Sequence, residues 1–405
     1  MKRLTYIFSI ILLAVSCTEM NPYEKDGLCT LSVTARYPEG HEYRDLGGLV
    51  ALVEDMNTGN RYMSSTDRDG NASFVLQRGL YRVAVTGLFD EDVYNGISDR
   101  MTLAGTDISL DLAMKHSKAG KLLVKEIYNG GCMKSPQEGS YQSDKYFILH
   151  NNDDEVQYLD GVCFGMLSPY NSTSSNPWVS KDPQTGESVF PDFLPILQTI
   201  WQFPGSGSDF PLQPGEDAVV CMNGAIDHSA EYPLSVNLNK EEYFVCYNET
   251  YFDNTMYHPA PGDRISQGRY MKVVVNMGQA KAYAFSVSSP TLVIFKAQDI
   301  TIQEHVNSVG ITPVPGSGTD NVVRIPFEWV LDAVEVFDAR SANNQKRLPP
   351  AMDAGYSLQT DVYLGRSHMR QVNEGATLVR GYEVLTDTNN SLNDFYESEK
   401  QSLHE

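Results

Sequence analysis

Short runs of alternating apolar and polar residues, closed by turn-forming residues, constrain this chain more than any other feature. Residues 29–35 alternate along their whole length, and residues 72–76 and 81–86 follow the same pattern. Such alternation places apolar side chains on one face of a strand. Asp69 and Gly70, just before the second run, favour a tight turn. The pattern predicts an all-β fold of two β-sandwich domains in tandem.

The first sandwich is expected over residues 28–114. Asn95 and Gly96 predict another tight turn within it, because this pair tolerates positive φ. Asp67 and Asp69 belong to an ordinary turn or, alternatively, hold a calcium ion. The remaining strands of this domain are expected at residues 49–54, 61–65 and 108–112.

Three short motifs of this domain resemble the carboxypeptidase-regulatory-like, transthyretin-like sandwich family. They are Thr-Asp-Arg-Asp-Gly at residues 66–70, Ala-Ser-Phe at 72–74 and Gly-Leu-Tyr-Arg-Val-Ala-Val at 79–85. Domains of that family are mostly scaffolds and spacers, so the resemblance implies a structural role for the first sandwich.

A short charged linker is expected at residues 115–120, followed by a second domain over residues 121–405. This domain is far longer than the roughly 100 residues of a bare immunoglobulin-like sandwich, so we expect long insertions. Its strands are expected at residues 122–128, 145–150, 156–161, 219–222, 273–275, 282–287, 292–295, 334–337 and 357–364.

Four segments of the second domain, taken in order, resemble the lamin-tail immunoglobulin-like fold. A strand at residues 122–128 ends in Asn-Gly-Gly, and a second strand at 145–150 leads into an Asn turn. Residues 212–220 contain a Leu-x-Pro-Gly-Glu turn, and residues 385–395 match the closing loop of that fold. The combination implies an immunoglobulin-like core.

The N-terminus has the marks of a secretory signal. A basic start is followed by an apolar stretch at residues 7–15, too short for the roughly twenty residues of a membrane-spanning helix. Small residues precede Cys17, which resembles the lipidated cysteine of bacterial lipoproteins, although Ala14 stands where Leu is common. Residues 1–16 are then a signal peptide and 17–27 a lipidated tether. The alternative is an ordinary signal peptide cut after Ser16.

Together, these features resemble a group of uncharacterised lipoproteins of the Bacteroidales, which brings no assigned activity. The resemblance implies an exported cell-envelope protein, anchored by its lipid. We expect it in the outer membrane, with the inner membrane as the alternative, and the acidic residues Glu19, Glu24 and Asp26 after Cys17 favour exposure at the cell surface. The chain has 31 Lys and Arg against 52 Asp and Glu, a formal charge of -21. Such a charge repels phosphate backbones and argues against nucleic-acid binding.

Five cysteines remain besides Cys17, so at least one of them is unpaired within the chain. Cys163 and Cys221 lie in apolar, strand-like stretches, where a thiol acts as a small buried hydrophobe. Buried thiols are favoured over one or two disulfides, which an exported protein also permits.

No catalytic motif is recognisable, and no cofactor is predicted. The Gly-x-Ser-x-Gly elbow and the His-Glu-x-x-His zinc motif are both absent. Asp227 and His228 are weak metal candidates, joined by Glu231, Asp253 or His258. The favoured alternative is that Asp227 and His228 form hydrogen bonds at a loop end.

A long insertion at residues 165–210 combines turn residues with aromatic side chains. Aromatic rings on a surface loop stack on sugars or anchor protein partners. Trp178 is expected to be the most exposed, and Tyr170 and Phe193 are the other ligand-binding candidates. Trp201 is expected in the core.

The leading hypothesis is a non-enzymatic lipoprotein that binds a glycan or protein partner through loops of the second sandwich. A second hypothesis is an accessory subunit of an outer-membrane uptake system for metal or glycan. A hydrolase on a sandwich scaffold is the third.

The N-terminal features generate a direct prediction about processing. Mass spectrometry of the mature chain, purified from membranes, should find an acylated Cys17 as its first residue, and Cys17→Ser should release the protein from the membrane. A mature chain that starts elsewhere and carries no acyl groups contradicts the prediction.

Overall fold

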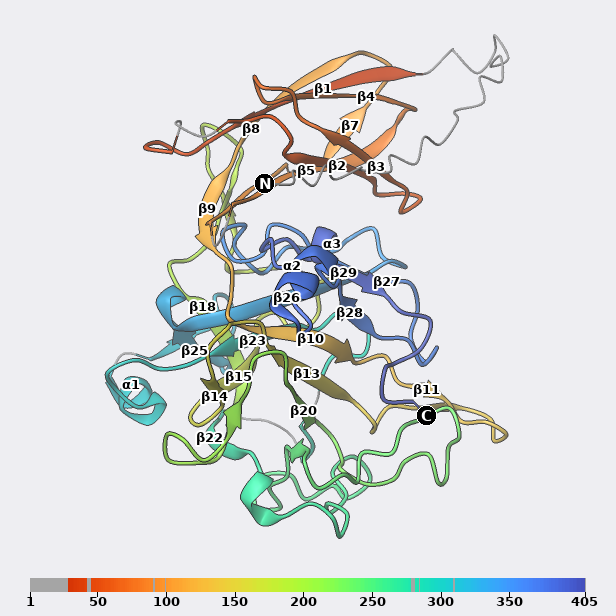
Figure 1. Cartoon of the computed structure of the whole chain (residues 1–405), viewed down its shortest axis with the longest axis vertical. Helices are drawn as coiled ribbons and strands as arrows, with labels where there is room; N and C mark the ends of the chain where they lie inside the picture. The colour runs from red at the N-terminus through yellow and green to blue at the C-terminus, as the bar shows by residue number, and fades with distance from the viewer. Residues whose placement is uncertain are drawn as a thin grey trace, which may run out of the picture.

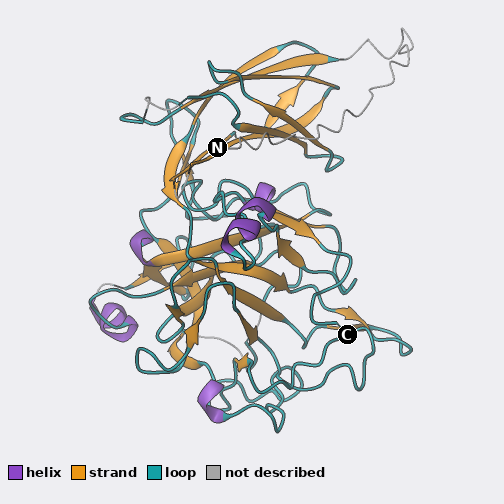
Figure 2. Cartoon of the chain, in the orientation of Figure 1, coloured by secondary structure: helices purple, strands orange, loops and turns teal. Residues whose placement is uncertain are grey.

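The computed structural model describes residues 28–41, 45–89, 92–98, 100–277, 281–283, 285–308 and 310–404. The predicted signal peptide, Cys17 and the predicted tether lie outside these residues. Figure 1 shows a smaller body of strands, red to orange, above a larger body formed by the rest of the chain. Strands dominate and helices are few and short (Figure 2), so the predicted all-β class is confirmed.

Two sheets form the N-terminal body. Alternate residues of the first strand, from Cys29 to Ala35, are buried, and they pack in one cluster with Val83 and Val85 of the other sheet. Alternation therefore sets which face of each strand is buried. The three-stranded sheet consists of β4 (Asn71–Leu76), β1 (Cys29–Arg36) and β8 (Ile108–Ala113). The six-stranded sheet consists of β3 (Arg61–Ser65), β2 (Val50–Asp55), β5 (Gly79–Phe89), β6 (Asp92–Ile97) and β9 (Lys115–Lys118), with β7 (Met101–Leu103) on β5.

The predicted Asp-Gly turn lies just before β4. Gly70 has φ +82°, and a Cβ there would lie 2.7 Å from the Ala35 carbonyl oxygen, so glycine is required. The Asp67 carboxylate accepts hydrogen bonds from the backbone N–H groups of Asn71 (2.8 Å) and Asp69 (3.0 Å). The bond from Asn71 lowers the pKa of Asp67. These contacts are those of an ordinary turn.

The C-terminal body has two large sheets packed face to face. Phe147 of one sheet and Phe164 of the other lie with ring centroids 4.9 Å apart in the largest core cluster. The first sheet consists of β21 (Phe244–Val245), β20 (Asp217–Cys221), β13 (Tyr146–Asn151), β10 (Leu122–Tyr128), β28 (His368–Arg370) and β29 (Phe395–Glu397). The second consists of β24 (Ile311–Pro313), β25 (Asn321–Ile325), β18 (Leu194–Gln202), β15 (Cys163–Leu167), β23 (Thr291–Phe295), β26 (Val330–Asp338) and β27 (Ser357–Gln359), with β22 (Lys272–Asn276) on β18.

Long loops between these strands carry small elements only. Three hairpins pair β11 (Cys132–Met133) with β12 (Ser140–Tyr141), β14 (Gln157–Tyr158) with β19 (Pro211–Leu212), and β16 (Ser180–Lys181) with β17 (Ser188–Val189). The helices are α1 (Ile302–Ser308), α2 (Glu374–Arg380), α3 (Ser391–Asp394), and the 3-10 turns η2 (Gln267–Arg269) and η3 (Phe327–Trp329). Within the described ranges, no helix is long and apolar enough to cross a membrane.

The turn predicted at Asn95 and Gly96 is wrong, because both residues lie inside β6. Gly96 is needed there for close packing, since a Cβ would lie 2.9 Å from Leu112. Asn95 is fully buried and donates hydrogen bonds to the carbonyl oxygens of Thr388 and Asn389. The Asn95-Gly96 pair favours a turn by its local chemistry, but here it lies in a strand, and Asn95 forms hydrogen bonds with a segment distant in the sequence.

Two further expectations need correction. Residues 115–118, expected in a linker, form β9 and pair with β6. Residues 282–287, expected as a strand, form none among those described. Side chains take over the hydrogen bonds of that segment: Asn223 and Lys145 donate to the carbonyl oxygens of Tyr283 and Phe285.

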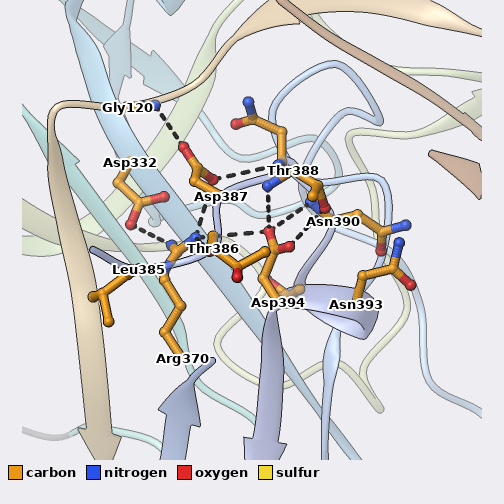
Figure 3. Close-up of polar contacts among 12 residues, drawn as sticks. Gly120, Asp332, Arg370, Leu385, Thr386, Asp387, Thr388, Asn390, Asn393 and Asp394 are labelled. Atoms are coloured by element: carbon orange, nitrogen blue, oxygen red, sulfur yellow. Dashed lines mark hydrogen bonds and ion pairs between the residues drawn. The ribbon is translucent and has the colours of Figure 1, made fainter. Parts of the chain in front are cut away.

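One buried arginine links the two sheets of the C-terminal body to its closing loop (Figure 3). Arg370 on β28 lies 2.7 Å from an oxygen of Asp332 on β26 and 3.0 Å from Asp387. A third carboxylate, Asp394 of α3, is 3.6 Å away. All four side chains are almost completely buried. An unpaired charge in the protein interior greatly lowers the free energy of unfolding, so removing any one of these four side chains would destabilise the fold through the charges left behind.

The same closing loop, residues 385–394, also contacts the N-terminal body. Thr86 of β5 accepts hydrogen bonds from Asn390 (3.0 Å) and Asn393 (2.9 Å). Arg82 of β5 lies over the ring of Tyr356, 4.8 Å from its centroid. Thus the Arg370 cluster orders a loop that fixes one sandwich against the other.

Replacing Arg370 tests this dependence. We expect Arg370→Met to lower the free energy of unfolding by about 3–5 kcal/mol, because buried carboxylates lose their cation. Arg36→Met is the control: Arg36 pairs with Asp111 on the surface, where the pair contributes less than about 1 kcal/mol. Urea unfolding monitored by circular dichroism measures both, and equal losses would contradict the assignment.

Candidate ligand-binding site

A cavity of about 540 Å³ lies in the C-terminal body beside β18. Its volume is within the range of small-molecule sites, roughly 300–1,000 Å³. Leu197 and Val322, paired across β18 and β25, form part of its apolar wall. The other lining residues are Ser168, Tyr170, Gln198, Met277, Ile311, Val314, Thr319, Asp320 and Asn321.

The cavity lies where β18 changes its partner strand. Residues 194–197 pair with β25, and residues 199–202 pair with β22. Gln198 falls between the two pairings and has φ 62°, a left-handed conformation rare for a residue with a side chain. Its carbonyl oxygen accepts a hydrogen bond from the N–H of Met277 (2.9 Å). The diverging partner strands leave space at this point.

Gln198 also has an unused polar atom. Its Oε1 is buried, and it has no hydrogen-bond partner among the described residues. A left-handed non-glycine residue costs about 1–3 kcal/mol, and such strain is concentrated at functional sites. A buried acceptor without a partner adds to that cost. Strain and an unused acceptor at one cavity wall together favour a binding role.

Tyr170, one of the predicted ligand contacts, lines this cavity. The side chain is partly buried, and burial raises its pKa to about 12, so the hydroxyl stays protonated at neutral pH. Its carbonyl oxygen accepts a hydrogen bond from Arg347 (3.2 Å), which is itself held by Glu335 (2.8 Å) in a fully buried ion pair. The core therefore fixes the position of Tyr170.

Trp178 and Phe193, the other two predicted contacts, lie together but do not line the cavity. Their ring centroids are 5.7 Å apart, and the Arg324 guanidinium lies 4.4 Å from the Phe193 centroid. Trp178, expected to be the most exposed of these residues, is partly buried and packs against the main core. Trp201 is fully buried, as predicted.

Thr319 and Asp320, just before β25, and Asn321, its first residue, contribute polar groups to the cavity. The Gly, Pro and Ser content of residues 313–320 predicts a loop but no role for these three residues. Asp320 accepts a hydrogen bond from the hydroxyl of Ser317 (2.9 Å), which orders the loop. The composition of residues 313–320 predicts the loop itself. It does not predict the cavity beside this loop, because another part of the wall comes from β18, which is distant in the sequence.

Asp227 and His228 are engaged in local hydrogen bonds. The ring nitrogens of His228 lie 2.6 Å from the Tyr141 hydroxyl and 3.0 Å from the Gly224 carbonyl oxygen. Burial lowers the pKa of His228. Asp227 accepts from the hydroxyl of Ser229 (2.6 Å). Both nitrogens of His228 thus have protein partners.

The other metal candidates have separate partners. Glu231 accepts from Tyr232 (2.6 Å), Asp253 pairs with Lys281 (3.4 Å), and His258 accepts from the Tyr283 N–H (2.7 Å). In the part of the chain that the structure describes, no three His, Cys, Asp or Glu side chains are placed to hold a metal ion.

The cysteines after Cys17 are all buried. Cys132, Cys163, Cys221 and Cys246 are free thiols. Burial raises the pKa of Cys163 to about 12, so this thiol stays protonated and unreactive. The structure agrees with the favoured interpretation of these residues as buried hydrophobes.

Comparison with known proteins finds similarity to a family without an assigned activity. Residues 213–402 match the profile of a family described as protein of unknown function (DUF4876). A crystal structure of a DUF4876 family protein from Bacteroides thetaiotaomicron is 24% identical, with a TM-score of 0.55, over 91% of this chain and 94% of that chain. The two proteins therefore share a fold over nearly their whole lengths.

A DUF3823 family protein from Parabacteroides merdae is 14% identical and covers 36% of this chain and 68% of its own. Its TM-score of 0.17 supports no argument about the fold. The search of curated proteins finds no match.

The conformation of Gln198 generates a stability prediction. We expect Gln198→Gly to leave the free energy of unfolding unchanged or to raise it by up to about 1 kcal/mol, because glycine adopts positive φ without strain and removes the unused acceptor. Thermal and urea unfolding measure the change. Thr199→Gly, at the next position of the same strand, should be clearly destabilising, since it removes a buried side chain bonded to Asn276. A similar loss at both positions would contradict the argument.

Proposed function

We propose that this protein is a lipid-anchored, non-enzymatic binding protein of the cell envelope that takes a neutral glycan into the cavity beside Gln198. The observation that carries the proposal is a strained glutamine whose amide oxygen lacks a partner at the wall of a ligand-sized cavity. Natural sequences relinquish stability at a site chiefly where function requires it.

The lining residues favour a neutral ligand with hydroxyl groups. The described residues around the cavity include no Lys or Arg, and Asp320 disfavours an anion. Gln198, Asn321 and Ser168 offer hydrogen-bonding groups, and the Tyr170 ring offers an aromatic surface. Sugars need this combination of polar groups and a flat apolar face.

The rest of the chain fits a role at a membrane surface. Cys17 would carry the lipid, and the first sandwich, which resembles carboxypeptidase-regulatory-like domains, would act as a spacer. The second sandwich, which resembles the lamin-tail fold, would present the cavity. Outer-membrane placement at the cell surface is part of this proposal, and the acidic residues Glu19, Glu24 and Asp26 after Cys17 favour surface export.

The cluster of Trp178, Phe193 and Arg324 supports a second candidate function. An arginine on an aromatic ring is typical of protein interfaces. The protein would then act as an accessory subunit of an outer-membrane uptake system, with this cluster facing an outer-membrane protein and the cavity holding the transported glycan.

Glycan arrays followed by calorimetry test the proposal with wild type, Gln198→Gly and Tyr170→Ala. We expect at least a tenfold loss of affinity in both variants, while Tyr158→Ala, which alters an exposed tyrosine outside the cavity, binds as wild type does. Trp178→Ala separates the two candidates, since it should spare glycan binding but abolish pull-down of a protein partner. A glycan bound equally by all variants contradicts the cavity as the site.

A further inference from the structure

A second cavity, of about 350 Å³, also has Tyr170 among its lining residues. Tyr257, Tyr283 and Phe285 form much of its aromatic wall, and Lys145, Asn223 and Gln142 supply polar groups. The two cavities share Tyr170, but their chemistry differs, because a lysine lines only this one.

Lys145 is buried without an ion-pair partner among the described residues, and only 4% of its surface is exposed. Its ammonium group donates to the Phe285 carbonyl oxygen (2.7 Å) and, at 3.5 Å, to Gln142 Oε1. An ammonium has three N–H donors, so at least one remains available. Burial lowers the pKa of Lys145 to about 7, because water no longer solvates the charge.

The adjacent carboxylate, Asp144, forms no ion pair with Lys145. One oxygen of Asp144 accepts hydrogen bonds from Tyr128 (3.0 Å) and Ser235 (2.6 Å). Burial lowers the pKa of Lys145 by more than the charge of Asp144 raises it. Among the described residues, the ammonium therefore has no carboxylate in direct contact.

Two further buried groups at this cavity are incompletely used. The Tyr283 hydroxyl and the Asn223 Oδ1 have no hydrogen-bond partner among the described residues, and both side chains are more than nine-tenths buried. The Asn223 amide nitrogen donates to the Tyr283 carbonyl oxygen (3.0 Å), so the two residues are adjacent. Lys145, Asn223 and Tyr283 all line one aromatic cavity, and each has hydrogen-bonding capacity that the described residues do not use.

We propose that this cavity binds a small organic acid with a ring body, holding its carboxylate on Lys145 and a hydroxyl group of the ligand on Asn223. The carboxylate supplies the missing counter-charge in a place where water does not screen it. Tyr170, Tyr257 and Tyr283 provide faces for the ring. This site is separate from the neutral-glycan cavity, so either proposal can fail alone.

Matched ligand pairs test the carboxylate directly on the full folded chain. Glucuronate is compared with glucose, and 4-hydroxybenzoate with 4-hydroxybenzyl alcohol, by calorimetry and by tryptophan fluorescence. Trp201 reports on the site because its ring centroid lies 5.6 Å from that of Tyr283. We expect at least tenfold tighter binding of one acid than of its neutral partner, and the pair that responds shows whether the ring is a sugar or an arene.

Variants then locate the site. Lys145→Met should remove the preference for the acid, whereas Lys272→Met, an exposed lysine elsewhere, should keep it. Tyr283→Phe removes only an unpartnered hydroxyl, so it should fold as wild type does and weaken acid binding severalfold. If Lys145→Met does not fold, Tyr283→Phe and Asn223→Ala decide the question. Equal binding of acids and neutral partners, or acid binding unchanged in the folded variants, overturns the proposal.

Discussion

The buried contact between Arg370 and three carboxylates is the interaction on which the remaining architecture depends. It joins β28 in one sheet of the C-terminal sandwich to β26 in the other, and both to the closing loop. Backbone groups complete the cluster, since Asp332 also accepts from the Val124 N–H (2.6 Å) and Asp387 from that of Gly120. A buried charge that is paired and hydrogen-bonded permits one arrangement of these segments.

Through this loop the two sandwiches become one framework. Asn95 and Thr86 of the first sandwich bind the loop that Arg370 orders, and Arg82 stacks on Tyr356 of the second. Because these contacts are polar and have specific geometries, they fix the orientation of the first sandwich on the second as well as holding the two together. A lipid on Cys17 would then position the cavities relative to the membrane through the first sandwich.

Both proposed sites follow from places where strand pairing is interrupted. At Gln198, β18 leaves one partner strand and joins another, and the larger cavity lies at that divergence. Beside Lys145, the described residues of the segment 281–288 have no ladder pairing, and side chains bond the carbonyl groups of Tyr283 and Phe285. Where the ladder is interrupted, side chains such as Lys145 and Asn223 bond the freed backbone carbonyl groups, and the hydrogen-bonding capacity that these side chains have left is available to a ligand.

The sequence by itself determined the all-β class and many strands, because alternation and turn chemistry are local. Residues 122–128 form β10 with the bounds expected, and Gly70 occupies the predicted turn. Only the tertiary structure decided the rest. Asn95 lies in a strand because a distant loop binds it, and Trp178 is partly buried because the core packs against it. Gln198 and Lys145 are important because each is buried with hydrogen-bonding capacity that the described residues do not use. Contacts between segments remote in the sequence create this burial, so no local pattern predicts it.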